Sequence, residues 1–201
     1  MIIPVVAVLA LLAPAVIGGR LGRLARVRVR RTGVIMCALL VQIFIVEVFT
    51  KPAWLLENAH VATYLAAAWF LWINRRIPGA PLLGLGAASN GVTITLNHGV
   101  LPASASALRS AGLAESLDRF ANSAPLAHPK LAFLGDVFAV PASWPLSNVF
   151  SVGDVLIIAG AAVASLRICG TYWSAGWLPF EPRHKLGWRQ RQLLKRQALS
   201  G

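Results

Sequence analysis

The sequence predicts an all-α membrane protein, a polytopic bundle of about five transmembrane helices with one long extracytoplasmic loop. Three observations predict this class. First, 57% of the 201 residues are hydrophobic and only 13% are charged, whereas soluble domains carry roughly 25% charged residues. Second, the apolar residues gather in long runs. Third, basic residues cluster between those runs. Together they exclude a soluble globule, a disordered chain and a disulfide scaffold.

A membrane-spanning helix needs about 20 mostly apolar residues. Five stretches approach this requirement: 2–19, 33–50, 54–73, 81–100 and 152–172. The first is followed, not preceded, by an arginine cluster, unlike a secretory signal peptide. The fourth is the weakest, because glycines and polar side chains interrupt it. We expect an integral membrane domain over 1–178 and a basic cytoplasmic tail over 179–201.

The basic residues predict the orientation. Of 19 lysines and arginines, 15 lie at or beyond the ends of the first, third and fifth stretches, and basic residues near spans stay on the cytoplasmic side. This places the N-terminus outside, the C-terminus inside and the loop 99–150 outside. Within that loop, 131–150 is predicted to be interfacial or re-entrant. The net charge of +12, which in a soluble protein would suggest nucleic acid, is then a topology signal, and no nucleic-acid partner is expected.

Small residues predict which helices pack most closely, because they let backbones approach in a membrane. The fourth stretch pairs Gly84 with Ala88, and the fifth places Gly153 and Gly160 one heptad apart. These two stretches are therefore the predicted central pair, while the first two face lipid more.

The outer loop contains two predicted helix starts. Residues 104–120 are expected to form a helix with an apolar stripe. At the other end of the loop, Ser151 precedes Asp154 by three residues, which is the spacing of a helix capping box. We interpret Asp154 mainly as a cap and keep a functional carboxylate as the alternative.

Three short motifs carry a family resemblance. They are Asn97-His98-Gly99-Val100-Leu101-Pro102-Ala103-Ser104, then Leu134-Gly135-Asp136, then Phe150-Ser151-Val152-Gly153-Asp154 leading into a helix. Over residues 80–170 the chain resembles an uncharacterised domain-of-unknown-function family of small multi-pass membrane proteins frequent in actinobacteria. The resemblance implies a multi-pass fold and no known activity. The family pattern has glycine where His98 stands, which argues against His98 as a shared functional residue.

Polar residues are predicted to gather at the outer ends of the helices and to line an outward-facing chamber. They are Asn58, His60, Asn90, Thr93, Asn97, His98, Asp136 and Asp154. Polar groups in a membrane are costly unless they face the interior or a cavity. A histidine beside Asp136 could form an acid–base pair. The simpler interpretation is that these side chains hydrogen-bond the loop onto the helices. No metal-binding spacing or nucleophile motif accompanies them, so we expect no metal and no cofactor.

Three functions follow from these patterns. The favoured one is a non-catalytic accessory or assembly component of the cytoplasmic membrane, since no catalytic set is evident. The alternatives are a carrier or sensor of a small solute or lipid through the polar chamber, and a membrane enzyme acting on a lipid headgroup. The expected partners are the lipid bilayer, with anionic headgroups at the basic loop and tail, and another membrane protein.

Overall fold

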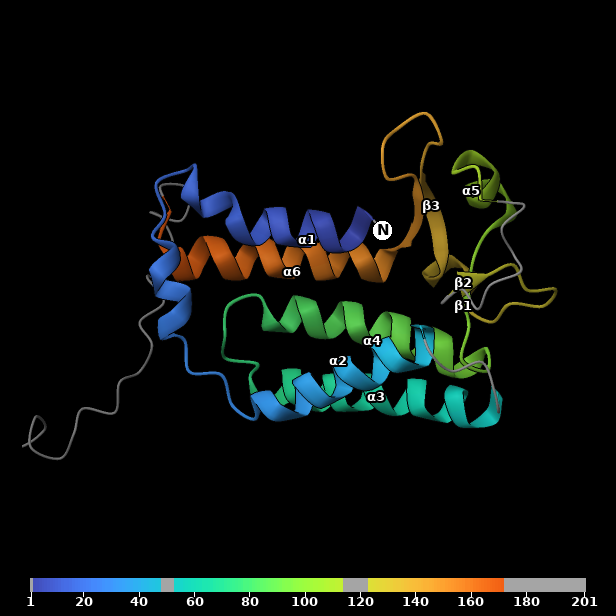
Figure 1. Ribbon diagram of the computed structural model, residues 1–201, viewed down its shortest axis with the longest axis horizontal. Helices are drawn as coiled ribbons and strands as arrows, with labels where there is room; N and C mark the ends of the chain where they lie inside the picture. Colours follow the sequence, from blue (N-terminus) through green and yellow to red (C-terminus); the bar gives the residue numbers. More distant parts are fainter. Residues whose placement is uncertain (1, 48–52, 114–122, 172–201) are drawn as a thin grey trace, which may run out of the picture.

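The computed structural model describes residues 2–47, 53–113 and 123–171. Its long helices run side by side along the long axis of the molecule (Figure 1). They are α1 (Ile2–Leu12), α2 (Thr32–Glu47), α3 (Ala53–Ile73), α4 (Ala80–Leu96) and α6 (Val152–Cys169). Short elements between α4 and α6 form a cap over one end of these helices. The predicted tail, 179–201, lies outside the described residues.

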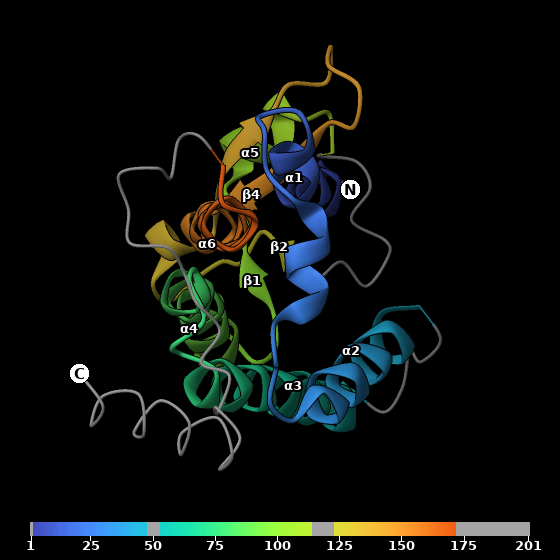
Figure 2. The ribbon, with the colours of Figure 1, turned by 90° about the vertical axis from the view of Figure 1, so that its left-hand side faces the viewer.

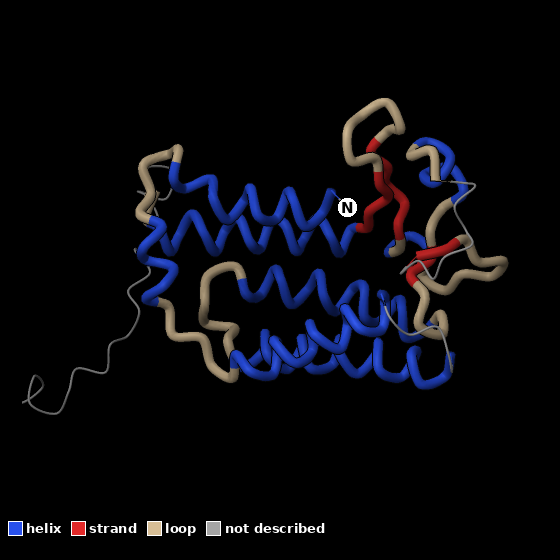
Figure 3. The backbone as a smooth tube through the Cα atoms, viewed as in Figure 1, coloured by secondary structure: helices blue, strands red, loops and turns tan. Residues whose placement is uncertain are grey.

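The cap, residues 101–151, contains α5 (Ala105–Ser110) and two small sheets (Figure 3). β1 (Leu101–Pro102) pairs in parallel with β2 (Ser123–Ala124), and β3 (Asp136–Val140) pairs antiparallel with β4 (Asn148–Ser151). A bridge between Ala103 and Asp136 joins the two pairs. The cap has its own hydrophobic core, which is made of small and aliphatic side chains: Ala103, Ala107, Leu108, Ala111 and Val149.

The prediction of an all-α bundle with five spans is wrong. The chain is about 62% helix and 10% strand, and the strands lie in the loop that the sequence assigned to helix and irregular structure. Among the described residues, only α6 is long and apolar enough to cross a membrane. The same part of the chain also holds three shorter apolar helices, Val5–Ala15, Thr32–Phe44 and Ala80–Leu96.

Local chemistry explains both errors. Pro14 replaces the end of α1 with a 3-10 turn, and α4 stops where His98 adopts a positive φ of 55°. In the cap, the apolar run around β3 is rich in β-branched and aromatic residues that favour strands. It forms a hairpin, with Pro141 and Pro145 in the connecting loop.

The predicted helix over 104–120 is much shorter than expected. Ser104 caps it as an N-cap residue should, since its Oγ accepts a hydrogen bond from the Ala107 amide at 3.1 Å. The helix ends at Ser110, and Gly112 then turns the chain with φ 70°. Residues 114–122 lie outside the described ranges.

Viewed along their axes, the long helices form an open arc in the order α1, α6, α4, α3, α2 (Figure 2). The most extensive contact is between α4 and α6, which confirms the predicted central pair. Only some of the glycines that the sequence predicts for this contact lie in it. A side-chain carbon at Gly160 would meet the Leu83 amide nitrogen at 2.7 Å, and one at Gly86 would meet the Gly153 carbonyl oxygen at 2.5 Å. Gly84 instead lies toward α3, with Leu71 Cβ 3.9 Å away.

Candidate functional site

The best-defined polar cluster joins α4 to the start of α6. Asn90 donates from Nδ2 to Asp154 Oδ1 at 3.2 Å and accepts at Oδ1 from Ser151 Oγ at 3.0 Å. Ser151 and Asp154 form the predicted capping box: the Asp154 amide donates to Ser151 Oγ at 3.0 Å and the Ser151 amide donates to Asp154 Oδ2 at 2.9 Å. We call Asn90, Ser151 and Asp154 the polar lock.

Gly153 lets the polar lock form. A side-chain carbon at Gly153 would collide with Asn90 Oδ1, so only glycine leaves room for the amide against the helix start. Asn90 is 4% exposed and Ser151 is fully buried. The capping residues at the start of α6 are thus hydrogen-bonded to Asn90 of α4. This contact holds the cap, residues 101–151, on the long helices.

Asp136 stands beside this lock. It begins β3 opposite Ser151 in the hairpin register, and its side chain is 5% exposed. Burial raises the pKa of Asp136 to about 6, the charge of Asp154 adds to the rise, and a hydrogen bond with the Ser123 side chain opposes it. Within the described part of the chain, no donor reaches the buried Asp136 Oδ1. The group is therefore a buried carboxyl that can change charge near neutral pH.

Asn97 performs a different task from Asn90. Its Nδ2 donates to the Lys130 carbonyl and its Oδ1 accepts from the Lys130 amide, both at 2.8 Å. In this way one side chain pairs with a distant backbone unit as a neighbouring strand would. Thr93, also buried, donates to the Ser89 carbonyl of its own helix at 2.9 Å. Both residues are occupied in holding the fold.

His60 belongs to another interface altogether. Its Nδ1 lies 2.9 Å from Gln42 Nε2 of α2, so the amide donates and the ring nitrogen accepts. Thr63 donates to Gln42 Oε1 at 2.7 Å, which completes a cluster between α2 and α3. The two remaining predicted residues, Asn58 and His98, are exposed.

The eight predicted residues therefore do not line one chamber. Asn90, Asp154 and Asp136 gather at the start of α6, Asn97 fastens the loop at Lys130, and His60 binds α2. Neither His60 nor His98 is hydrogen-bonded to Asp136 among the described contacts, so the acid–base pair required by the enzyme hypothesis is not assembled. The interpretation that these groups tie the loop to the helices describes Asn90 and Asn97 well.

Sequence reasoning missed several partners of these residues. Ser151 was read only as a cap, although it also binds Asn90, and Gln42 and Thr63 were not assigned to any site. Asn74 was missed as well: its side chain pairs with both backbone groups of Arg30, at 2.9 and 3.0 Å. Asn74 and Asn97 each directly follow a long helix, and that position is the signal that could have found both.

His98 adopts a left-handed backbone conformation, with φ 55°. Glycine reaches this conformation without strain, whereas a histidine does so only at some cost. The side chain is exposed.

Comparisons with known proteins place the chain in a family. A family model described as a family of unknown function (DUF5317) matches residues 26–166. An uncharacterized protein of Thermotoga maritima is 35% identical over 95 residues, which is 47% of this chain and 54% of the relative, so the chain spans about half of that relative's length. No solved structure matches. Because the matched region contains α2, α3, α4, the cap and most of α6, the chain belongs to the family of unknown function DUF5317.

Proposed function

We propose that this protein is a non-catalytic accessory or assembly component embedded in the cytoplasmic membrane. In this proposal the cap faces outward, and the opposite, arginine-rich end contacts the cytoplasmic leaflet. The observation that carries the proposal is the distribution of side chains over the long helices, where large apolar side chains are exposed on the outside while several polar side chains are buried between the helices.

Large apolar side chains cover the outside of the helices. On α2, Met36, Leu40 and Phe44 are 55%, 53% and 52% exposed, and on α3 Leu65 is 67% exposed. Similar residues lie along α1, with Leu9 60% exposed. Exposed apolar side chains that extend over several helices are typical of a surface that contacts lipid or another protein. Lipid chains would cover it without cost.

Polar side chains, in contrast, lie between the helices. His60, Asn90, Thr93 and Ser165 are between 0% and 4% exposed, and each has a hydrogen-bond partner in the fold. Ser165 of α6, for example, donates to the Ala10 carbonyl of α1 at 2.7 Å. In a bilayer, polar groups must be satisfied inside the protein. The hydrogen bonds of Asn90, Thr93 and Ser165 meet that requirement, whereas among the described residues the buried His60 Nε2 and Ser89 Oγ have no hydrogen-bond partner.

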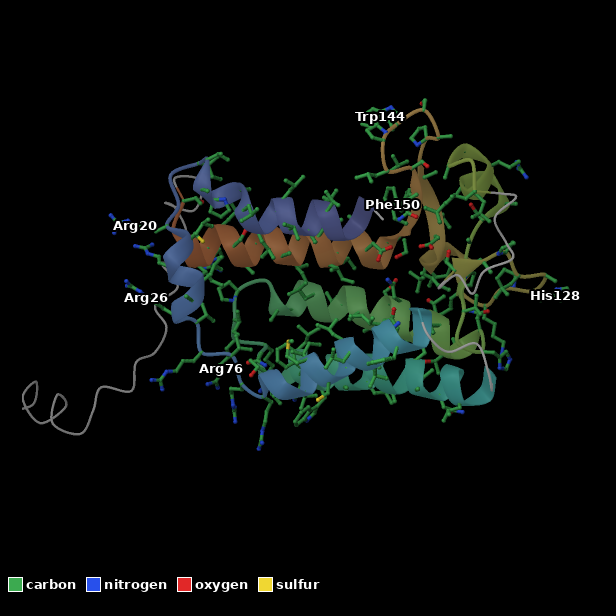
Figure 4. The ribbon with its side chains drawn as sticks, viewed as in Figure 1. Arg20, Arg26, Arg76, His128, Trp144 and Phe150 are labelled. Carbon is green, nitrogen blue, oxygen red and sulfur yellow. The ribbon has the colours of Figure 1, made fainter. Side chains whose placement is uncertain are left out.

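Arginines are more numerous at the end of the helices away from the cap, although exposed Arg109 and Lys130 lie on the cap. Arg20, Arg26 and Arg76 lie at the end away from the cap, whereas His128 and Trp144 lie on the cap (Figure 4). Arg75 at the same basic end stacks over Trp72 with 4.5 Å between the guanidinium carbon and the ring centroid. A tryptophan beside arginines is typical of a membrane–water boundary. Anionic headgroups would attract each arginine there by about 1 kcal/mol.

The way in which the polar groups are used supports the accessory role. The polar lock, Asn97 and the His60 cluster are engaged in joining helices and loops, so their hydrogen bonds serve the architecture. A protein that uses its polar residues in this way, while exposing apolar helix sides, is suited to pack beside other membrane proteins.

Location is tested by extraction and labelling. The protein should stay with membranes after alkaline carbonate treatment. In a background with both cysteines replaced by alanine, His128→Cys should react with a membrane-impermeant maleimide on intact cells, and Arg26→Cys should react only after permeabilisation. Release by carbonate, or labelling of Arg26→Cys in intact cells, would contradict the proposed placement.

The accessory role needs a separate experiment. Protein purified from its native membrane in a mild detergent should carry a second membrane protein in constant stoichiometry, measured as total protein mass by light scattering. A protein that purifies as a monomer without any partner would refute the accessory role and leave the membrane placement standing.

A further inference from the structure

We infer that the loop between β3 and β4, residues 141–147, is a finger that inserts shallowly into the outer leaflet of the bilayer. This inference rests on the proposed membrane location and adds to it a specific lipid-binding surface in the cap. We call residues 141–147 the finger.

The finger projects beyond the helices. It extends past the outer side of α1 near the start of that helix, in two views at right angles (Figures 1 and 2). Trp144 lies at its tip (Figure 4). The finger is thus at the level where the apolar sides of α1 would leave the lipid, and it continues that surface outward.

The chemistry of the finger suits the boundary between headgroups and acyl chains. Its sequence, Pro-Ala-Ser-Trp-Pro-Leu-Ser, has no charged residue. Trp144 is 66% exposed and Leu146 is 51% exposed. Tryptophan prefers this boundary because its ring is apolar while its N–H remains near water.

The fold holds the finger in place. The Ala142 amide donates to the Ser110 carbonyl at the end of α5, at 2.9 Å, and the Trp144 amide donates to the Pro141 carbonyl at 3.0 Å. At its base, Phe138 stacks on Phe150 with ring centroids 5.3 Å apart. Leu146 adopts a positive φ of 62°, a conformation that is strained for leucine. Two prolines and these contacts keep the apolar side chains exposed rather than folded back onto the cap.

The loop carrying His128 supplies an internal contrast. His128 is also exposed on the cap, but it extends away from the helices along their axis (Figure 4). Lipid would meet Trp144 and would not reach His128. The two positions therefore form a matched pair for an experiment.

The test uses the full chain in lipid nanodiscs of phosphatidylcholine and phosphatidylglycerol, with Cys37 and Cys169 replaced by alanine. An environment-sensitive fluorophore is attached at Ser143→Cys, which keeps Trp144, and in parallel at Trp144→Cys. His128→Cys is the matched control on the cap, and Leu40→Cys reports on the exposed side of α2. Each is quenched separately by lipid spin-labelled near the headgroup and by aqueous iodide.

We expect the lipid quencher to remove more than half of the fluorescence at positions 143 and 144, which iodide should hardly affect. Position 128 should show the reverse. Equal iodide quenching at positions 143, 144 and 128 overturns the proposal that the finger inserts into lipid. Protection from both quenchers also overturns it, because protein rather than lipid would then cover the loop. If Leu40→Cys remains protected from iodide in those cases, the membrane proposal survives. If Leu40→Cys is open to iodide, both proposals fall.

Discussion

The interface between α4 and α6 differs from the interface between α2 and α3 in how its two helices are held. The first brings backbones together through Gly86 and Gly160 and is closed at the end nearest the cap by the polar lock. The second depends on a cluster of Gln42, His60 and Thr63. Around that cluster, most of the described surface of α2 is exposed.

The two kinds of contact therefore have different structural roles. Close backbone packing with a satisfied polar group makes α4 and α6 the centre of the arc, from which β4 and the cap are positioned. The peripheral helix α2 is held by hydrogen bonds along one side. Its remaining sides are available to lipid or to a partner, and the two interfaces should therefore respond very differently to substitution.

The largest effect is expected at the glycine contact. A methyl group at Gly86 would lie 2.5 Å from a backbone oxygen that cannot move aside without shifting α6. Gly86→Ala should therefore lower the free energy of unfolding by at least about 3 kcal/mol, the upper range for overpacking. Reversible unfolding in mixed detergent micelles measures this change.

Gly84→Ala is the matched control for that variant. It adds the same methyl group to the same helix, but at ordinary contact distance, 3.9 Å from Leu71 Cβ. It should be neutral or stabilise by up to about 1 kcal/mol through helix propensity. Equal losses for the two variants would show that the α4–α6 interface is not the tight one.

Asp136, beside the polar lock, should make the stability of the folded protein depend on pH. The pKa of Asp136 is raised from 3.8 to about 6 in the fold, so the folded protein binds more protons than the unfolded chain between those values. Stability should fall as the pH rises through this window. A pKa rise of this size corresponds to as much as about 3 kcal/mol.

Asp136→Asn should remove that dependence. The variant should be more stable than the parent at about pH 8 and should lose that advantage toward about pH 2, where the carboxyl is neutral in both states. Unfolding at a series of pH values tests this. A pH-independent difference between variant and parent would mean that Asp136 keeps its ordinary pKa.

Double-mutant cycles compare the polar contacts of the two interfaces directly. The Asn90–Asp154 pair involves a carboxylate, so its coupling energy should be about 1.5 kcal/mol. The neutral Gln42–Thr63 pair should reach only about 0.6 kcal/mol, as is common within membranes. Alanine substitutions, singly and together, supply both cycles. A larger coupling for Gln42–Thr63 would reverse the proposed ranking of the interfaces.

The smallest effect is expected on the outer side of α2. Leu40 is 53% exposed, so Leu40→Ala in a bilayer should change stability by less than about 0.5 kcal/mol. Ala38 is 8% exposed on the buried side of the same helix, and Ala38→Leu should cost about 1–3 kcal/mol. A large loss for Leu40→Ala would reveal that a second protein, rather than lipid, covers this side.

Sequence reasoning recovered the five long helices approximately, and the capping box at Ser151 and Asp154. It also identified α4 and α6 as the central pair. These features depend on composition, periodicity and spacing of three or four residues, which are visible along the chain. The same reasoning failed for the cap, since a run such as Val137–Val140 is equally apolar in a helix and in a strand. It also overestimated span length, because a proline or a left-handed residue shortens a helix without changing its hydropathy.

The candidate site was recovered only in part. Asn90, Asp136 and Asp154 do meet, but His60 and Asn97 serve other interfaces. A run of polar residues shows how far along a helix they lie. It does not show which neighbouring helix or loop each side chain contacts. That choice depends on the rotation of each helix in the arc.

By itself, the sequence determined that the chain forms long apolar helices, with arginines clustered in the connections that follow the first and the third of them. Those properties are local and follow from residue type and order. Only the tertiary structure decided that Gly86 rather than Gly84 meets α6, that Ser151 binds Asn90, and that Asp136 is buried beside them. Each of these contacts joins residues far apart in sequence, and each exists because two backbones approach closely enough to leave one arrangement for the side chains between them.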